Sequence, residues 1–228
     1  MDVKDILSSV GSPFSQGSGL VLERLHRDAQ NDRKVFLRSA PAAFGAWIRG
    51  RSPIAAAIPY LKDAYLPVSP EMGRFLQITA RLAGAKTIVE FGSSFGISAI
   101  YLASGLMPGG RFIGSEREPN KVIRARKNLA EAGLSEVAEI REGDAMETLS
   151  DIEGPIDILF LDGWKDLYLP LLQKLKPKLR PGSLVMADNV YTFKRDLAPF
   201  VMFMQDPQNG FASVTLPFSS GLEYAVAL

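Results

Sequence analysis

The amino-acid sequence predicts a doubly wound α/β fold with a mostly parallel, seven-stranded sheet, an antiparallel C-terminal hairpin and a helical N-terminal extension. From Lys86 onward, short apolar runs alternate with amphipathic segments of helix length. Such β-α-β alternation is typical of a parallel sheet with helices on both faces. Residues 211–228 add two short runs joined by the turn-like "PFSSG", which predicts a hairpin at one sheet edge.

The N-terminal part has a different pattern. Residues 19–38 carry apolar side chains at helical spacing, namely Leu22, Leu25, Ala29 and Phe36. Prolines then recur between positions 41 and 70, which excludes long helices there. Residues 69–85 predict a helix with Ser69 as N-cap and Pro70 at the first helical position. We therefore divide the chain into an extension, residues 1–63, and a main domain, residues 64–228.

The strands and helices of the main domain follow from local patterns. The expected strands are "TIVEF", "RFIGSE", "VAEIRE", "IDILFLD" and "SLVMAD". The segments "GISAIYLASGL", "NKVIRARKNLAEAGL" and "YLPLLQKLKPKL" lie between them and have helical periodicity. This order predicts one core rather than two domains.

Composition limits the possible functions. The 228 residues are 46% hydrophobic and 22% charged, as in an ordinary globular protein, and the net charge is +1. Lys and Arg are scattered, so neither nucleic acid nor an anionic membrane is an expected partner. Without cysteine there are no disulfides or thiolate metal sites. No leader pattern and no apolar run of about 18 residues is present, so we expect a cytoplasmic protein. The single histidine, His26, is expected on the surface, which argues against zinc or histidine-triad chemistry.

Polar or small residues follow each expected strand, where an open parallel sheet binds its ligands. Gly92 and Gly96 flank a tight turn after the first strand, before a helix that opens near Ile97. Their G-x-x-x-G spacing differs from the G-x-G-x-x-G of dinucleotide sites. Glu116, after the second strand, stands where an acid reaches a ribose diol, and Asp144 follows the third. The alternative interpretation is tight packing at the glycines and a solvated charge at Glu116.

Asp162 ends the fourth strand, and Asp188 and Asn189 end the fifth. Neighbouring strands lie about 5 Å apart, so these side chains can converge on one point. Two carboxylates that close would repel each other, and a hard divalent cation removes that cost. An all-oxygen set suits magnesium, with calcium or manganese as competitors. Alternatively, Asp188 and Asn189 cap a turn.

Several stretches together resemble a known family. The run "IVEFGSSFGISAIYLA", Glu116 and "GDA" resemble class I S-adenosylmethionine (SAM)-dependent methyltransferases. The stretches "LPVSPEMGRFLQ", "FLDGWKD" and "ADNV" narrow the resemblance to the cation-dependent O-methyltransferases of the catechol and caffeoyl-CoA type, over residues 64–228. The resemblance implies a Rossmann-like methyltransferase fold and O-methylation of a small phenolic, catechol-like acceptor. It implies cofactor contacts from Val68, Glu90, Gly92, Ser93, Gly96, Ser98, Glu116, Arg117, Asp144, Ala145, Asp162 and Trp164.

The resemblance also assigns roles on the acceptor side. Lys165 corresponds to the general base that deprotonates the acceptor hydroxyl, although an exposed lysine is the plainer alternative. Asp162, Asp188 and Asn189 correspond to the metal ligands, and Lys165, Asn189 and Glu223 to substrate contacts. The alternative for Glu223 is an ordinary charge on the last strand. Trp164 packs either beside the adenine or in the core.

The sequence departs from the family at two places. Gly163 stands where the catechol enzyme has a histidine, so we expect a more open acceptor side. The segment of residues 40–66 matches no family we know, and we expect it to cover the acceptor site. Its apolar residues predict a homodimer: Phe44, Trp47, Ile48, Ile54 and Ile58.

Two other functions compete. A nicotinamide-dependent oxidoreductase lacks support because the third glycine is missing and Asp162, Asp188 and Asn189 would be idle. A SAM-binding protein without chemistry would need neither Lys165 nor the metal set. The sequence does not identify the acceptor.

Overall fold

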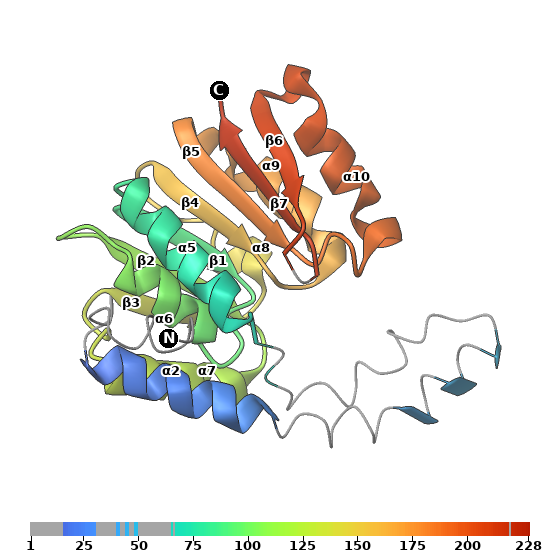
Figure 1. The fold of residues 1–228 in the computed structure, drawn as a ribbon. Helices are drawn as coiled ribbons and strands as arrows, with labels where there is room; N and C mark the ends of the chain where they lie inside the picture. Colours follow the sequence, from blue (N-terminus) through green and yellow to red (C-terminus); the bar gives the residue numbers. More distant parts are fainter. Residues whose placement is uncertain are drawn as a thin grey trace, which may run out of the picture.

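The structure is a computed structural model that describes residues 16–30, 40–41, 44–45, 48–49, 65, 67–218 and 220–228. The described residues form a seven-stranded sheet of order β3-β2-β1-β4-β5-β7-β6 (Figure 1). The strands are β1 Thr87–Phe91, β2 Arg111–Glu116, β3 Ala138–Glu142, β4 Ile156–Leu161, β5 Leu179–Asp188, β6 Phe211–Leu216 and β7 Leu222–Ala227. The predicted fold class is confirmed.

The direction of the strands also agrees with the prediction. The first five strands pair in parallel: β1 with β2 and β4, β2 with β3, and β4 with β5. In contrast, β7 is antiparallel to both β5 and β6. Chain order runs outward from β1 in both directions, so the switch point lies between β1 and β4. In such sheets the ligand site lies beyond the carboxyl ends of the strands at that point.

Helices cover both faces of the sheet. One face carries α2 Gln16–Ala29, α5 Pro70–Leu82, α6 Ile97–Ser104 and α7 Pro119–Glu131. The other carries α8 Ala145–Thr148, α9 Tyr168–Leu175 and α10 Lys194–Gln205. Short 3-10 turns span Lys165–Leu167, Lys176–Lys178 and Pro207–Asn209. The sequence patterns did not indicate α10, which contains Pro199.

Local chemistry explains how α5 begins. Ser69 accepts a hydrogen bond from Met72 N at 3.2 Å through its side chain, and Pro70 occupies the start of the helix. Met72, Leu76 and Ala80 then recur at helical spacing and are buried. The predicted cap is therefore confirmed, and it orients α5 over the sheet.

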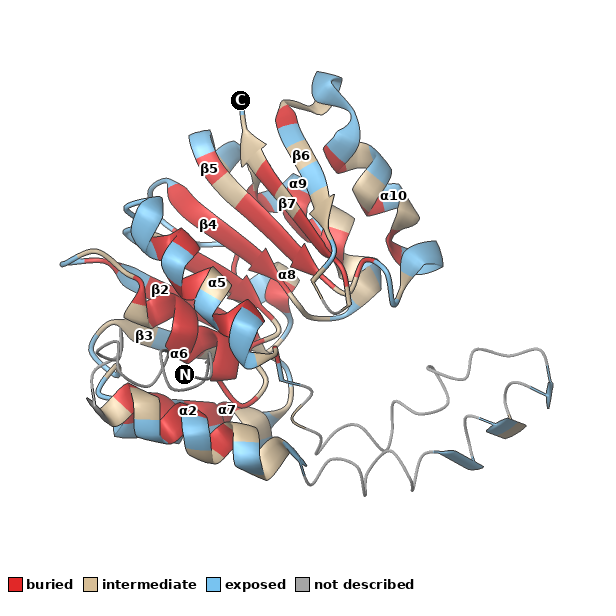
Figure 2. Cartoon of the chain, in the orientation of Figure 1, coloured by how far each residue is buried: buried red, intermediate tan, exposed pale blue. Residues whose placement is uncertain are grey.

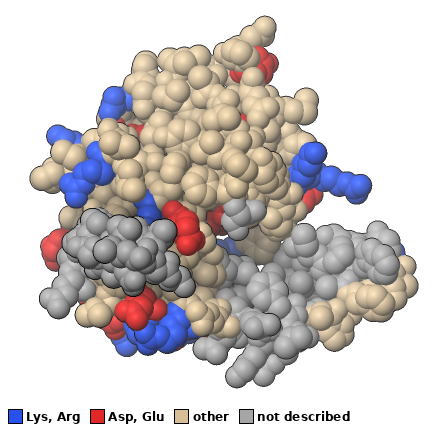
Figure 3. Space-filling model, in the orientation of Figure 1, with Lys and Arg blue, Asp and Glu red and all other residues tan. Residues whose placement is uncertain are grey.

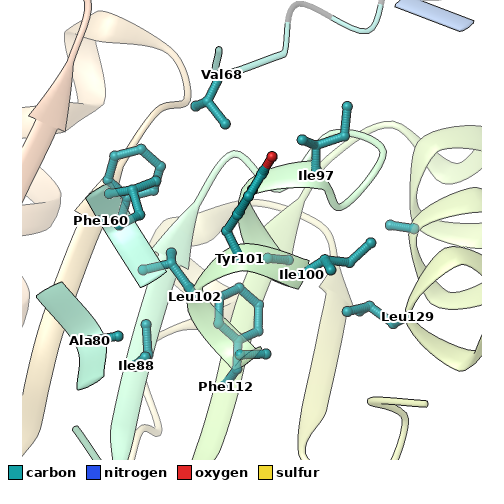
Figure 4. Packing of buried hydrophobic residues seen from close by; sticks show 14 of the residues in the cluster. Val68, Ala80, Ile88, Ile97, Ile100, Tyr101, Leu102, Phe112, Leu129 and Phe160 are labelled. Carbon is teal, nitrogen blue, oxygen red and sulfur yellow. The ribbon is translucent and has the colours of Figure 1, made fainter. Parts of the chain in front are cut away.

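The core has two parts, one on each side of the sheet (Figure 2). Adjacent residues of one strand contribute to opposite parts: Ile158 and Phe160 pack under α5 and α6, whereas Leu159 and Leu161 pack under α9. This explains the apolar run of residues 158–161 in β4, because a strand buried on both faces has no solvent-facing side there. Figure 4 shows the first part.

The N-terminal helix α2 is integrated with this core. Val21, Leu22 and Leu25 are buried in the first cluster. His26 is only partly exposed, and its Nε2 lies 3.1 Å from Tyr101 Oη, so the expected surface position is wrong. The physical reason is a tertiary contact with α6 that the polar sequence around His26 does not indicate.

Most of the expected cover over the acceptor site lies outside the described residues. This includes Trp47, Ile54 and Ile58, while Phe44 and Ile48 are described and exposed. Phe36, at the end of the expected helix of residues 19–38, also lies outside the described residues. No helix in the described part of the chain is both long and apolar enough to cross a membrane. On the face in Figure 3, acidic and basic groups are interspersed rather than gathered by sign.

Candidate functional site

The turn after β1 has an unusual backbone. Gly92, Ser94 and Gly96 have φ values of 95°, 46° and 85°, all in the left-handed region. Glycine adopts this region freely, but serine does so at a cost. We call residues 92–96 the cofactor turn. Because α6 begins at Ile97, the turn lies at the N-terminus of a helix at the switch point.

Strand β2 holds the cofactor turn from one side. The backbone N–H groups of Gly92 and Ser93 donate to the carbonyl of Ser115 at 3.0 and 3.1 Å. Ser94 N donates to Glu116 Oε2 at 2.8 Å, and Glu118 N donates to Glu116 Oε1 at 2.9 Å. Glu116 thus fixes the turn, in addition to the ribose contact that the sequence predicts.

A small pocket opens over this turn. Its lining includes five of the predicted site residues: Val68, Gly92, Ser93, Ser98 and Asp162. It also includes residues that were not predicted as site residues: Tyr65, Pro67, Ser94, Phe95 and Ile97. Of these, Ser94, Phe95 and Ile97 lie within or next to the glycine motif, and that proximity was the available signal.

Glu90 lies on β1 just before the pocket and is completely buried. Neither of its carboxylate oxygens, nor Ser93 Oγ, has a hydrogen-bond partner in the part of the chain that the structure describes. Burial raises the pKa of Glu90 to about 7. The hydroxyls of Ser93 and Ser98, which lie nearby but outside hydrogen-bond geometry, oppose the rise, and the charge of Glu116 adds to it. A buried acceptor without a donor is costly, so this group is suited to a ligand that donates hydrogen bonds.

The remaining predicted cofactor residues lie at the ends of β2 and β3. Asp144 is exposed and caps α8 by accepting from Met146 N at 2.8 Å. Ala145 is buried and Arg117 is exposed. These three residues do not line the pocket described above, and their contact with a cofactor stays a prediction.

The ends of β4 and β5 bring Asp162, Lys165 and Asp188 together. Lys165 Nζ lies 3.7 Å from Asp162 Oδ1 and donates to Tyr168 Oη at 2.8 Å. Burial raises the pKa of Asp162 well above its usual value, and the charge of Asp188 adds to the rise. Burial also lowers the pKa of Lys165, against the opposing effect of the two carboxylates. The lysine amine therefore lies near two carboxylates, of which that of Asp188 is buried and that of Asp162 is partly exposed.

Asp188 and Asn189 are held as a unit. Asp188 Oδ1 accepts from Asn189 N and Ser220 Oγ, both at 2.7 Å, and its Oδ2 accepts from Asn189 Nδ2 at 3.1 Å. Asn189 has a φ of 71°, so the chain turns sharply at the strand end. The described residues contain no group of three or more His, Cys, Asp or Glu side chains that could hold a metal. The candidate set is two carboxylates and an amide. Its oxygen donors and its excess of negative charge fit a hard divalent cation.

Comparisons with known proteins show the family of the chain. A profile of an O-methyltransferase family matches residues 57–199, more than half of the chain. The chain belongs to this O-methyltransferase family.

Relatives within the O-methyltransferase family include two bacterial catechol O-methyltransferases. That of Niastella koreensis is 39% identical over 144 residues, which cover 60% of this chain and 65% of the relative. That of Mycobacterium tuberculosis is 35% identical over 141 residues, covering 60% and 64%. The match thus spans slightly under two thirds of each relative's length.

Solved structures of O-methyltransferases have the same fold. The enzyme from Bacillus cereus, in complex with SAH, has a TM-score of 0.73 at 23% identity, with 99% of this chain and 97% of that chain covered. TomG from Streptomyces achromogenes, in complex with SAM, has a TM-score of 0.65 at 27% identity, with 71% and 82% covered.

Two expectations about this O-methyltransferase family member need correction. A Cβ at Gly163 would lie 2.6 Å from Phe91 Cε1, so the ring of Phe91 occupies the space that a side chain would take. The missing side chain therefore does not open the acceptor side. Trp164 is 47% exposed, which excludes the core alternative.

Glu223 is almost fully buried on β7. Ser213 Oγ and Thr215 Oγ1 donate to its two oxygens, each at 2.5 Å, and Gln205 Nε2 donates to Oε1 at 3.2 Å. None of its hydrogen bonds reaches Lys165 or Asp188. The structure thus places Glu223 in a network between the hairpin and α10, and its role toward a substrate stays a prediction.

Proposed function

We propose that the protein is a SAM-dependent O-methyltransferase that methylates a hydroxyl of a small phenolic, catechol-like acceptor. The observation that carries this proposal is the position of Lys165. Its amine lies between Asp162 and Tyr168, and Asp162 also lines the pocket over the cofactor turn. Asp162 therefore lies next to the proposed general base, Lys165, and also lines the pocket proposed for the cofactor.

The proposed SAM site uses the turn and the acids around it. The cofactor turn would bring backbone close to the ligand, and Glu116, which holds that turn, is the proposed partner of the ribose hydroxyls. The buried carboxylate of Glu90 lacks a donor, and the ammonium of the cofactor's amino-acid part can supply one. SAM carries no phosphate, which agrees with the absence of a dinucleotide glycine pattern.

Lys165 is proposed to accept the proton of the acceptor hydroxyl. Burial lowers the pKa of Lys165 and so favours its neutral form, which a general base requires. Tyr168 Oη donates to the backbone oxygen of Asp188 at 3.3 Å and must therefore accept from Lys165. Tyr168 Oη can accept an N–H from the charged or the neutral lysine. In the neutral form, the lone pair of Lys165 Nζ then stays free to point at the acceptor hydroxyl.

Asp162, Asp188 and Asn189 would hold a divalent cation, for which magnesium is the first choice and calcium or manganese the alternatives. When bound, such an ion lowers the pKa of a phenol and fixes its oxygen. The chain's own residues position that oxygen near the cofactor pocket. In the transfer itself, the methyl–sulfur bond of SAM breaks as the bond to the acceptor oxygen forms, and SAH leaves. Alignment and electrostatic placement supply most of the acceleration.

The phenolic acceptor rests on the resemblance and on the relatives named catechol O-methyltransferase. The exposed ring of Trp164 beside Lys165 is available to pack against a flat acceptor. We also retain the proposal of a homodimer in the cytoplasm. Light scattering at tens of micromolar tests assembly, and a monomer would count against it.

The test is SAH release from SAM over a panel of phenols, with and without EDTA. We expect turnover with a catechol-like acceptor, its loss in EDTA, and nearly unchanged SAH binding in EDTA. Asp188→Ala should reproduce the chelated state, because one of two carboxylates is lost. Full activity in EDTA would refute the metal, and no SAH release with any hydroxyl acceptor would refute the methyltransferase proposal.

A further inference from the structure

The cofactor turn is held from a second side by Asn128 of α7. This side chain is 5% exposed, and its Nδ2 donates to the carbonyl of Phe95 at 2.9 Å. Phe95 lines the pocket and lies between Ser94 and Gly96, the residues with positive φ. A left-handed serine costs free energy, so the turn depends on such outside contacts to keep its shape.

Arg24 of α2 determines which way the Asn128 amide faces. Its Nη2 donates to Asn128 Oδ1 at 3.0 Å. A guanidinium only donates, so it must face the amide oxygen, and the amide nitrogen then faces Phe95. With Arg24 removed, a flipped amide would place its oxygen against the Phe95 carbonyl and lose the bond to the turn.

The helix that carries Arg24 is well placed for this role. Arg24 also forms an ion pair with Glu131 at 2.6 Å, and Ser18 Oγ donates to the carbonyl of Ala132 at 3.0 Å. On the other side, His26 contacts Tyr101 of α6, the helix that follows the turn. In Figure 1, α2 runs beside α7, and in Figure 4 the Tyr101 hydroxyl points toward the end of the cluster with Val68 and Ile97. Thus α2 contacts the helices on both sides of the turn, although it lies outside the family match of residues 57–199.

We propose that α2 is part of the cofactor site, with Arg24 and Asn128 as positioning residues for the cofactor turn. Arg24 orients the Asn128 amide, and Asn128 holds the Phe95 carbonyl so that the turn is preformed for SAM. This inference rests on the proposed SAM binding, but it needs neither the metal nor Lys165.

Preformation predicts a specific kinetic signature. If only part of the protein population has the correct turn, the apparent affinity falls in proportion to that fraction. Once SAM saturates the enzyme, the turn is formed and the chemical step proceeds normally. Loss of Arg24 should therefore raise KM for SAM and Kd for SAH while leaving kcat almost unchanged.

The experiment compares Arg24→Met with Arg27→Met. Arg27 lies one turn along α2 and pairs with Glu23 at 2.8 Å on the exposed side, so it is a matched control. Asn128→Asp is the second variant, because it keeps an oxygen for Arg24 but replaces the donor to Phe95. Calorimetry gives Kd for SAH, steady-state kinetics separate KM from kcat, and urea unfolding verifies the fold.

We expect SAH binding about tenfold weaker in Arg24→Met and Asn128→Asp, the scale of one lost buried hydrogen bond. Arg27→Met should stay within about twofold of wild type. If wild type binds SAH and both test variants bind within twofold of it, the inference is wrong. A fall in kcat with unchanged KM would also overturn it, since that is general structural damage. If wild type itself binds no SAH, the proposed function and this inference fail together.

Discussion

Tyr168→Phe tests whether Lys165 must be oriented as well as present. Tyr168 is completely buried, and its ring packs edge-on against Phe91 and Phe200 at centroid distances of 6.3 and 5.6 Å. Phenylalanine keeps those ring contacts and removes only the hydroxyl. The variant therefore loses the hydrogen bond from Lys165 Nζ and the one to the Asp188 carbonyl.

The size of the effect follows from these two bonds. A bond to a charged group contributes about 1.5–3 kcal/mol and a neutral one about 1 kcal/mol, so the free energy of unfolding should fall by about 2–4 kcal/mol. If half of the stronger contribution, about 0.75–1.5 kcal/mol, is needed to direct the lone pair, kcat should fall by about 4- to 13-fold. KM for SAM should not change, because Tyr168 does not line the cofactor pocket.

Urea unfolding and steady-state kinetics with saturating SAM measure both effects. Tyr224→Phe is the control, because Tyr224 packs in the cluster on the opposite face of the sheet. A Tyr168→Phe variant with wild-type kcat, alongside an inactive Lys165 variant, would refute the orientation argument.

Three further outcomes follow from the site. Glu116→Ala should lose most of the rise in melting temperature that SAH gives wild type, because a ligand stabilises the fold it binds; an unchanged rise would place the ribose elsewhere. Lys165→Ala should reduce turnover by about 10²–10⁴-fold and recover in part as the pH rises and the acceptor ionises unaided; a flat pH dependence would contradict the base role. Glu90 is protonated more tightly when folded, since its pKa rises from 4.5 to about 7. Its contribution to stability is therefore complete below pH 4.5 and is lost as the pH rises through 7. Between pH 5 and 8 the free energy of unfolding of the cofactor-free wild type should fall by about 3 kcal/mol more than that of Glu90→Gln. Parallel urea curves for the two proteins would rule this out.

Local signals in the sequence were sufficient for the sheet and the glycine turn. The cap at Ser69 and the apolar run of β4 depend only on residues close in the chain, so local periodicity and composition were enough to predict them. The helix α10 was not, because Pro199 lies inside it and interrupts the usual pattern.

Contacts between residues far apart in the chain could not be predicted from the sequence. His26 and Tyr101 are 75 positions apart, and Arg24 and Asn128 are 104 apart. Polar residues in a polar stretch give no sign of such partners, because these contacts depend on which helices become neighbours. The same holds for Glu223, whose donors belong to the other strand of the hairpin and to α10.

The close approach of Gly92 and Gly163 has a practical consequence for protein engineering. A Cβ at Gly92 would lie 2.6 Å from Gly163 Cα, and one at Gly163 would collide with Phe91. Libraries that vary position 163 to alter the proposed acceptor choice would therefore displace the backbone next to the cofactor turn, and many members should lose the proposed cofactor binding as well. Trp164, which is 47% exposed and lies next to Lys165 in the chain, is a better position to diversify, because its side chain can change without moving the backbone.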